Sequence, residues 1–338
     1  MMQILQSAIS RAAFPVALAA LWLQAAWSQP VDIRVHDPVM IRQDGVYYLF
    51  CTGRGLSVFS STDRKTWERK PAVFEAAPEW TTRLFPNFRN SEWAPDITHH
   101  NGVYYLYYSV SSFGSNNSAI GVATNTTLNP DDPAFKWVDH GPVVRSVAGR
   151  DMWNAIDPNL AFDDTGVPWL SFGSFWLGIK LVRLHESLTE VAQPEEWYTI
   201  AARFRDWKLE ERDAGDSLNS TIEAPFIFKK NGFYYLFVSW DRCCRGRDST
   251  YKVVAGRSEK ISGPYLDKEG HDMRIGGGTL VVGGNSRWPG VGHNSAYTFD
   301  GVDYLVFHGY DVNDEGRSKL WIKEIEWHGK GWPRVALD

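Results

Sequence analysis

A short cassette of residues recurs five times along this chain. In each copy a polar residue stands six to nine positions before a glycine, and an aromatic or β-branched run follows the glycine. Four of the five glycines come directly after Asp or Asn, as in a tight turn between two strands. The lead polar residues are spaced by 59, 61, 66 and 70 positions, and they are Asp37, Asp96, Asp157, Glu223 and His293.

This repeat predicts an all-β fold. Sustained helical periodicity is rare, whereas strand-like runs such as 47–50 and 119–123 follow one another along the chain. Repeats of about sixty residues built from short strands are typical of a β-propeller, in which each repeat forms one four-stranded blade around a central channel. We therefore predict a five-bladed β-propeller.

Residues 1–28 have the composition of a secretory signal peptide. A basic residue, Arg11, precedes an apolar run from Ala12 to Ala26, and small residues at Ala26 and Ser28 suit a signal peptidase. The run is too short to span a membrane; a buried N-terminal helix is the alternative. We expect cleavage before Gln29, a secreted or periplasmic protein, and one catalytic propeller domain over residues 29–338.

The exported part of the chain is mildly acidic. Without Arg11 it carries 34 basic and 40 acidic residues, a net charge of −6, and no block of like charges. This argues against nucleic acid or an anionic membrane as a partner. The sixteen tryptophans and fourteen tyrosines can serve as packing mass or as flat platforms for sugar rings. A propeller closed on itself is expected to be a monomer.

Three cysteines are too few for a disulfide framework in an exported protein of this size. Cys51 lies inside a strand-like run and is expected to be a buried free thiol. Cys243 and Cys244 are adjacent, and neighbouring Cα atoms lie about 3.8 Å apart, which is below the usual disulfide range. A bridge between them is possible but strained.

Equivalent residues of a propeller lie at one depth around its channel. If each lead residue begins the innermost strand of its blade, four acids and one histidine form a ring at one mouth of the channel. Like charges so close raise one another's pKa, and such a ring is typical of a functional site. The alternative is that the acids are turn residues facing solvent, in particular Asp96, which is offset within its cassette.

Several carboxyl groups in an aromatic-rich pocket are typical of glycoside hydrolysis. Glu223 stands between apolar residues, and a carboxyl group in apolar surroundings stays protonated near neutrality, as a general acid must. Asp37, held by the following proline, would either activate water or attack the sugar. Asp157 would orient Glu223, and His293 is interpreted as a channel ligand for an ion or water.

Several motifs together resemble the endo-α-1,5-L-arabinanases of glycoside hydrolase family 43, from about Val35 to Pro333. In order they are VHDPV at 35–39, WAPD at 93–96, YLYYS at 105–109, WNAIDP at 153–158, SFGSFW at 171–176, IEAPF at 222–226, SW at 239–240, CC at 243–244 and GHNS at 292–295. The resemblance implies a five-bladed propeller that acts on arabinan and arabino-oligosaccharides and needs no organic cofactor.

The resemblance also implies roles for individual residues. The mechanism would be inverting, with Asp37 as general base, Glu223 as general acid and Asp157 as the acid that positions and tunes Glu223. His293 would face a structural ion, calcium by analogy with the family, in the central channel.

Eight residues match positions that line the sugar site of the family, and these are His36, Trp93, Phe113, Gly114, Asn154, Ser174, Phe175 and Trp176. Ser174, Phe175 and Trp176 are expected on the strand that follows Asp157. Trp93 and Phe113 are expected as walls of a groove. Ordinary blade packing is the alternative for Trp93 and Phe175. Sugar contacts near the insertion at 206–220 are left open.

Two other activities compete with an endo-acting arabinanase. An exo-acting α-L-arabinofuranosidase or β-xylosidase of the same family would need a closed pocket, whereas we expect an open groove because the chain ends soon after the fifth blade. A sugar-binding propeller without catalysis is the rival from another class. Such a module has no need of two acids in opposed environments with a third beside them.

Overall fold

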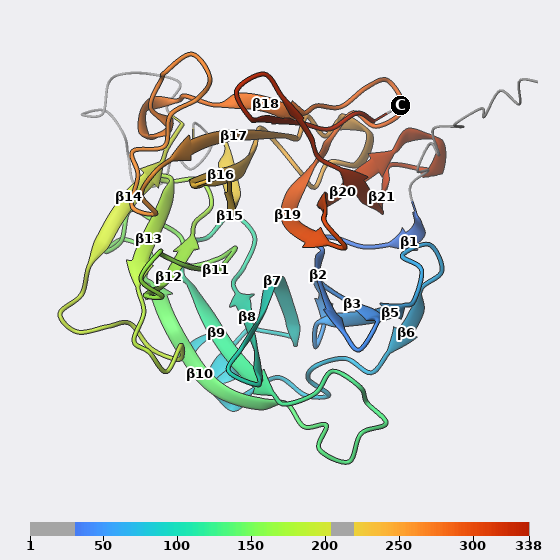
Figure 1. The fold of residues 1–338 in the computed structure, drawn as a ribbon. Helices are drawn as coiled ribbons and strands as arrows, with labels where there is room; N and C mark the ends of the chain where they lie inside the picture. The colour runs from blue at the N-terminus through green and yellow to red at the C-terminus, as the bar shows by residue number, and fades with distance from the viewer. Residues whose placement is uncertain (1–30, 204–219, 338) are drawn as a thin grey trace, which may run out of the picture.

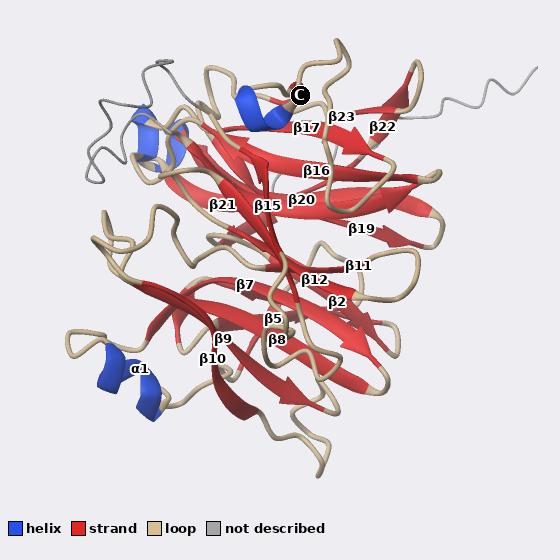
Figure 2. Ribbon diagram, turned by 90° about the vertical axis from the view of Figure 1, so that its left-hand side faces the viewer, coloured by secondary structure: helices blue, strands red, loops and turns tan. Residues whose placement is uncertain are grey.

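The computed structural model describes residues 31–203 and 220–337. Strands make up almost all of the regular structure, and short helical segments are confined to the connections (Figure 2). The signal peptide predicted over residues 1–28 and nearly all of the insertion at 206–220 lie outside the described residues. No helix in the described ranges is long and apolar enough to cross a membrane.

Five antiparallel sheets stand around a common centre, so the five-bladed propeller is confirmed (Figure 1). Blade 1 comprises β2 (Val39–Gln43), β3 (Val46–Cys51), β5 (Ser57–Ser61) and β6 (Glu68–Lys70). Blade 2 comprises β7 (Ser91–His100), β8 (Val103–Val110), β9 (Ser118–Asn125) and β10 (Val138–Ser146), with β4 (Gly53–Arg54) beside β7. Blade 3 comprises β11 (Asn159–Phe162), β12 (Pro168–Phe172), β13 (Ile179–Arg183) and β14 (Trp197–Ala201).

Blade 4 comprises β15 (Ile222–Lys230), β16 (Phe233–Trp240), β17 (Lys252–Ser258) and β18 (Thr279–Val282). Blade 5 comprises β19 (Val291–Phe299), β20 (Val302–Asp311), β21 (Arg317–Glu324) and β1 (Val31–Arg34). The connections hold α1 (Glu79–Leu84), η3 (Gly246–Asp248), η4 (Met273–Ile275), η5 (Val312–Asp314) and a hairpin of β22 (Glu326–His328) and β23 (Trp332–Arg334).

The last blade is completed by the first strand of the chain. β1 pairs antiparallel with β21, so residues near the two ends of the described chain lie in one sheet. The repeat alone did not predict this closure, because β1 precedes the first cassette and carries none of its features. It joins blade 5 to blade 1 and closes the ring.

The core is divided into wedges between neighbouring blades. In β2, Val39 packs in a cluster with residues of blade 2, whereas Met40 packs in a cluster with residues of blade 5. Successive side chains of a strand point to opposite faces, and here both faces are buried. This explains why the second strands of the cassettes are continuous apolar runs rather than alternating ones. A core spread over wedges also explains how so long a chain forms one ring.

The turns after the innermost strands are the ones that the cassette predicted. Both residues of each Asp-Gly or Asn-Gly pair have positive φ, as a two-residue hairpin turn requires, and the pairs begin at Asp44, Asn101, Asn231 and Asp300. The innermost strands β2, β7, β11, β15 and β19 contact one another in sequence around the channel. The residues near the starts of these five strands therefore share one channel mouth.

Candidate active site

One residue near the start of each innermost strand has a left-handed backbone conformation. The five are Asp37 (φ 56°), Ala94 (φ 42°), Asp157 (φ 59°), Ala224 (φ 55°) and His293 (φ 50°). We take these positions as equivalent around the ring, which corrects the cassette in two blades. Glu223 comes one residue before its equivalent, and Asp96 comes two residues after. The lead residues also do not all begin their strands, since β2 begins at Val39 and β7 at Ser91.

The backbone N–H groups of these residues link neighbouring blades. Each donates to a side chain near the end of the second strand of the preceding blade. The four pairs are Ala94 with Thr52 Oγ1 (2.9 Å), Asp157 with Ser109 Oγ (3.0 Å), His293 with Ser239 Oγ (2.9 Å) and Asp37 with His308 Nδ1 (3.2 Å).

Ala224 is the exception, because the matching residue of the preceding blade is Gly173, which has no side chain. Its N–H donates instead to Oδ2 of Asp157 at 3.1 Å. The missing side chain thus brings Asp157 across to blade 4, directly beside Glu223.

Asp37 is surrounded by histidines. The carboxyl group is buried, and its Oδ1 lies 2.7 Å from Nδ1 of His36 and 2.9 Å from Nδ1 of His293. The Thr52 hydroxyl donates to Oδ2. Burial acts to raise the pKa of Asp37, but His293 and His36 outweigh it and hold the pKa well below its usual value. Asp37 is therefore a carboxylate at neutral pH.

His293 carries the matching positive charge. Burial lowers its pKa, but the nearby Asp37 and Asp157 carboxyl groups raise the pKa of His293 to about 9. This imidazolium therefore stabilises the ionised form of Asp37 from within the channel.

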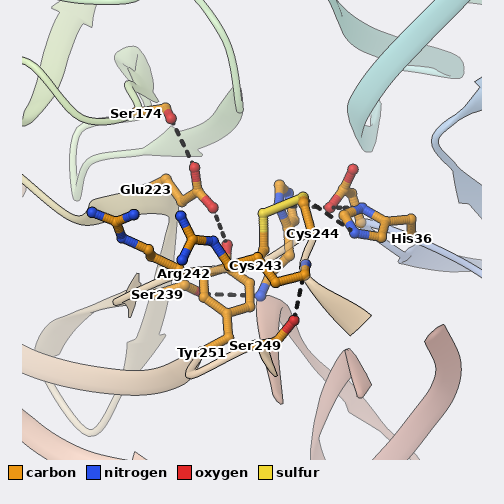
Figure 3. Close-up of a disulfide and its surroundings, with 12 residues drawn as sticks. His36, Ser174, Glu223, Ser239, Arg242, Cys243, Cys244, Ser249 and Tyr251 are labelled. Carbon is orange, nitrogen blue, oxygen red and sulfur yellow. Dashed lines mark hydrogen bonds and ion pairs between the residues drawn. A yellow bond between two sulfur atoms is a disulfide. The ribbon is translucent and has the colours of Figure 1, made fainter. Parts of the chain in front are cut away.

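Glu223 has a different environment. Its Oε2 accepts a hydrogen bond from Ser174 Oγ at 2.8 Å and its Oε1 accepts one from Tyr251 Oη at 2.7 Å (Figure 3). The apolar setting suggested by the neighbouring residues is therefore wrong for the carboxyl group itself, because those neighbours face the blade core. Burial raises the pKa of Asp157 to about 8 against the opposing charge of His293. Asp157 thus retains a proton at neutral pH, directly beside Glu223.

Ser174, Phe175 and Trp176 lie in the loop after β12, not on a strand as predicted. Phe175 (φ 58°) and Trp176 (φ 42°) are half-buried and left-handed, a conformation that is strained for bulky residues and clusters at functional sites. The Phe175 N–H donates to the Ile222 carbonyl at 2.7 Å, which ties this loop to the residue before Glu223. The structure therefore brings all three residues to the Glu223 side.

The remaining sugar-site candidates lie in two places. Asn154 is buried three residues before Asp157, and its Oδ1 has no protein partner, so it can accept a hydrogen bond from a ligand. Phe113 is 84% exposed and precedes Gly114 (φ 75°) in the loop after β8. Asn116 anchors that loop through its side chain to the Asp151 and Trp153 carbonyls at 2.7 and 3.1 Å, beside Asn154.

Trp93 is half-buried in β7 opposite Ser109. Asp96 is buried rather than facing solvent, which excludes the alternative considered for it. It accepts hydrogen bonds from Asn159 Nδ2 at 3.3 Å and Leu160 N at 2.8 Å, so it links blades 2 and 3. Burial raises the pKa of Asp96 to about 7.

A family model described as glycosyl hydrolases family 43 matches residues 28–333 of this chain. The chain belongs to this family. The resemblance that the motifs carried is therefore confirmed.

Relatives in family 43 differ in the activity that their names state. An extracellular exo-α-(1→5)-L-arabinofuranosidase from Cellvibrio japonicus is 52% identical, over 90% of this chain and 87% of the relative. An extracellular endo-α-(1→5)-L-arabinanase from Bacillus subtilis is 43% identical, over 91% of this chain and 90% of the relative. The solved structure of a Cellvibrio cellulosa α-L-arabinanase complexed with arabinohexaose is 52% identical and superimposes with a TM-score of 0.86, over 90% of this chain and 96% of that one.

Three residues of this family 43 site escaped the sequence analysis, and they are Tyr251, His308 and Tyr310. Each lies on the second or third strand of a blade or beside it, inside a run that reads as core. The Tyr251 hydroxyl group bonds Glu223, His308 accepts from the Asp37 N–H, and the Tyr310 hydroxyl group contacts His36. The only available signal was that His308 replaces the Ser or Thr of other cassettes at the same position.

The ion expected at His293 stays a prediction, and the donor atoms around it can be described. Nδ1 of His293 contacts Asp37, and Nε2 of this imidazolium carries a hydrogen, so it could meet an ion only through water. The next residue, Asn294, has an amide whose oxygen and nitrogen are both buried without a protein partner, and an amide oxygen is a ligand that calcium accepts. A second group, His36, Asp37 and His308, has its ligand atoms within 4.8 Å of one another, but two imidazoles do not make a calcium site.

Proposed function

We propose that this chain hydrolyses α-1,5-linked L-arabinan with inversion at the anomeric carbon. Asp37 is the general base and Glu223 the general acid. One observation carries the proposal: the carboxyl groups have opposed environments, with Asp37 between two histidines that keep it ionised and Glu223 beside the buried Asp157 that retains a proton. An inverting hydrolase needs both states in one pocket.

In the proposed reaction a water molecule lies between Asp37 and the sugar. Asp37 takes a proton from the water as its oxygen forms a bond to the anomeric carbon. Glu223 gives a proton to the oxygen of the departing sugar as the glycosidic bond breaks. Ser174 and Tyr251 hold the Glu223 carboxyl group in place, and the Oδ2 of Asp37 keeps a lone pair for the water beside its bond from Thr52.

Asp157 and His293 act on these two groups in the proposed mechanism. Asp157 is fixed by the Ala224 N–H and keeps its proton until about pH 8, so in the proposed mechanism it is the local source of the proton that Glu223 passes to the leaving oxygen. His293 balances the charge of Asp37. A channel ion, calcium by the resemblance, would be held by oxygen ligands such as Asn294 Oδ1 and water, and the His293 imidazolium would face it through water.

Substrate binding and localisation belong to the same proposal. Arabinose rings would contact His36, Asn154, Ser174, Phe175 and Trp176 near the carboxyl groups, with Trp93, Phe113 and Gly114 farther along a groove. The relatives whose names include "extracellular" support export of this chain through the segment at 1–28. We expect a monomer.

Cleavage inside the polymer is the first mode that we propose, on the motifs shared with endo-arabinanases. Exo action is the second candidate, because the relative that is 52% identical is named as an exo-acting arabinofuranosidase.

A product profile tests the proposal. Purified residues 29–338 are incubated with debranched arabinan and, separately, with an aryl α-L-arabinofuranoside. Short oligosaccharides of many lengths early in the reaction would support endo action, and one short product from the start would support exo action. Proton NMR of the first product gives its anomeric form, and retention would exclude the Asp37 base. Binding of arabinan without any cleavage would overturn the enzyme in favour of a sugar-binding propeller.

A further inference from the structure

The two adjacent cysteines form a disulfide at the edge of the channel mouth. Cys243 and Cys244 are bonded to each other in the turn between β16 and η3, and Cys244 is exposed. Cys51 is buried and free, as expected. In Figure 3 the disulfide stands between Glu223 on one side and His36 on the other. Neither cysteine has a part in the proposed proton transfers.

Three hydrogen bonds connect this disulfide to Asp37. The Cys244 N–H donates to Oη of Tyr310 at 2.8 Å, and that oxygen lies 2.7 Å from Nε2 of His36. Nδ1 of His36 lies 2.7 Å from Oδ1 of Asp37. Tyr310 is buried, so solvent does not compete for its hydroxyl group.

Two hydrogen bonds at this site have a fixed direction, because the backbone N–H groups of Asp37 and Cys244 can only donate. The Asp37 N–H donates to Nδ1 of His308, and burial holds the pKa of His308 well below its usual value, so this neutral ring carries its hydrogen on Nε2. That Nε2–H lies 3.2 Å from Oη of Tyr310. Tyr310 therefore accepts from both His308 and Cys244.

The Tyr310 hydroxyl group lies 2.7 Å from Nε2 of His36 and 4.0 Å from Sγ of Cys244, so His36 is the nearer of these two partners. This contact at Nε2 holds the His36 ring with Nδ1 facing Asp37, 2.7 Å from its Oδ1. The chain of bonds thus decides which face of His36 the base meets.

The disulfide is what holds the first of these donors in place. Cys244 has φ 64°, a left-handed conformation that costs free energy for a residue other than glycine. Such a conformation persists where the surrounding structure over-determines it, and the bond to Cys243 closes a small ring around this peptide. Without the bond, Cys244 is free to relax to negative φ, and its N–H then turns away from Tyr310.

We propose that the Cys243–Cys244 disulfide positions the general base through Tyr310 and His36, so that reduction of this bond slows catalysis without weakening substrate binding. The inference rests on the proposed function, in which Asp37 is the base. Reduction by a dithiol breaks the S–S bond and leaves two thiols, while the dithiol gives up two electrons and two protons and forms its own cyclic disulfide.

The test compares oxidised and reduced protein on debranched arabinan. Dithiothreitol should release two titratable thiols under native conditions and lower kcat about tenfold, the size expected for one lost hydrogen bond, with KM unchanged. Reoxidation should restore kcat. The Cys243→Ser/Cys244→Ser variant should have the kcat of the reduced protein, and dithiothreitol should not change it.

Tyr310→Phe separates this route from others. The oxidised variant should lose kcat by a similar factor, and reduction should lower it no further, because the link is already broken. Tyr235→Phe is the matched control: its hydroxyl bonds the Gly331 carbonyl, and the variant should keep the full response to reduction. If reduction unfolds the protein, the oxidised Tyr310→Phe variant decides alone, and an unchanged kcat overturns the inference.

Other outcomes would overturn the positioning role. An equal further loss on reduction of Tyr310→Phe would exclude the route through Tyr310. A rise in KM at constant kcat would mean that the disulfide touches substrate instead. The proposed function is tested separately by the oxidised wild type, and it is wrong if this protein does not cleave arabinan. If the protein does cleave arabinan, but reduction and Tyr310→Phe both leave kcat unchanged, only this inference is wrong.

Discussion

The two sides of the channel mouth hold the same functional group in opposite chemical settings. On one side, blades 5 and 1 surround Asp37 with His36 and His293, and charge keeps it ionised. On the other side, blades 3 and 4 place Glu223 between two hydroxyl groups and beside Asp157, which burial keeps protonated. A repeat that is nearly symmetric in backbone thus gives its carboxyl groups opposite settings, through the side chains of neighbouring blades, and these settings suit the proposed base and the proposed acid.

Removing either carboxyl group should give the largest loss of kcat. The two losses should differ in how they depend on the leaving group. Asp37→Ala and Glu223→Ala should each lower kcat on arabinan by about 10³-fold, within the range for general acid–base catalysis. With an aryl arabino-oligosaccharide whose phenol is a good leaving group, only Glu223→Ala should recover, because such a phenol needs no proton. Recovery of Asp37→Ala instead would exchange the two roles.

Replacing Asp157 should give the next largest effect, which should be seen in the pH dependence of kcat/KM. Its raised pKa means that the proton is present below about pH 8 and lost above it. The kcat/KM of wild type should therefore fall as pH rises through about 8, when Asp157 loses its proton. Asp157→Asn should lower activity by about tenfold to a hundredfold and remove or move this alkaline limb.

Asp96→Asn is the control for the pH profile, because Asp96 is also a buried acid with a raised pKa but lies outside the pair of Asp157 and Glu223. It should keep the alkaline limb of wild type. An unchanged limb in Asp157→Asn would contradict the assignment of the retained proton to Asp157.

The hydroxyl groups on Glu223 should matter less than the carboxyl groups. Tyr251→Phe and Ser174→Ala each remove one hydrogen bond to Glu223, so kcat should fall about tenfold in each, the size of one such bond. Tyr265→Phe is the matched control, because its hydroxyl bonds the Ile261 carbonyl. Steady-state kinetics and thermal melting measure both effects. A lower melting temperature at unchanged kcat would assign the hydroxyl groups to stability alone.

Phe113 should show the smallest effect, at the surface on the Asp157 side. Because the ring is 84% exposed, Phe113→Ala should leave the melting temperature unchanged. It should raise KM for arabinan about fivefold, as the loss of a stacking surface worth about 1 kcal/mol predicts. Leu280→Ala, at another exposed apolar residue, should change neither. An unchanged KM for Phe113→Ala would remove Phe113 from the groove.

The blades and turns could be predicted from the sequence because their signals are local. Each cassette carries its own turn and its own apolar strand, so the number of blades follows from the number of cassettes. The exact equivalence of the lead residues could not be predicted, because the strand register shifts between Trp93 and Asp96 and between Glu223 and Phe226. A shift of one or two residues is invisible in a repeat whose copies already differ in length.

The partners of the carboxyl groups were harder to predict than the carboxyl groups themselves. His308 lies 271 residues after Asp37 and bonds its backbone, and a lone histidine in an apolar strand reads as a core residue. Gly173 reads as a turn glycine, yet its missing side chain is what directs the Ala224 N–H to Asp157. These contacts depend on which blade adjoins which, and that is a property of the closed ring.

Ring closure also sets when this protein can first act. Asp37 emerges early in synthesis, but His293, His308 and Tyr310 emerge with the last blade, and β1 then pairs with β21 to hold that blade in place. A chain still on the ribosome, or cut before its final strands, carries Asp37 without the histidines and the tyrosine that surround it in the closed ring. The proposed base therefore reaches its working environment only when the last blade has formed.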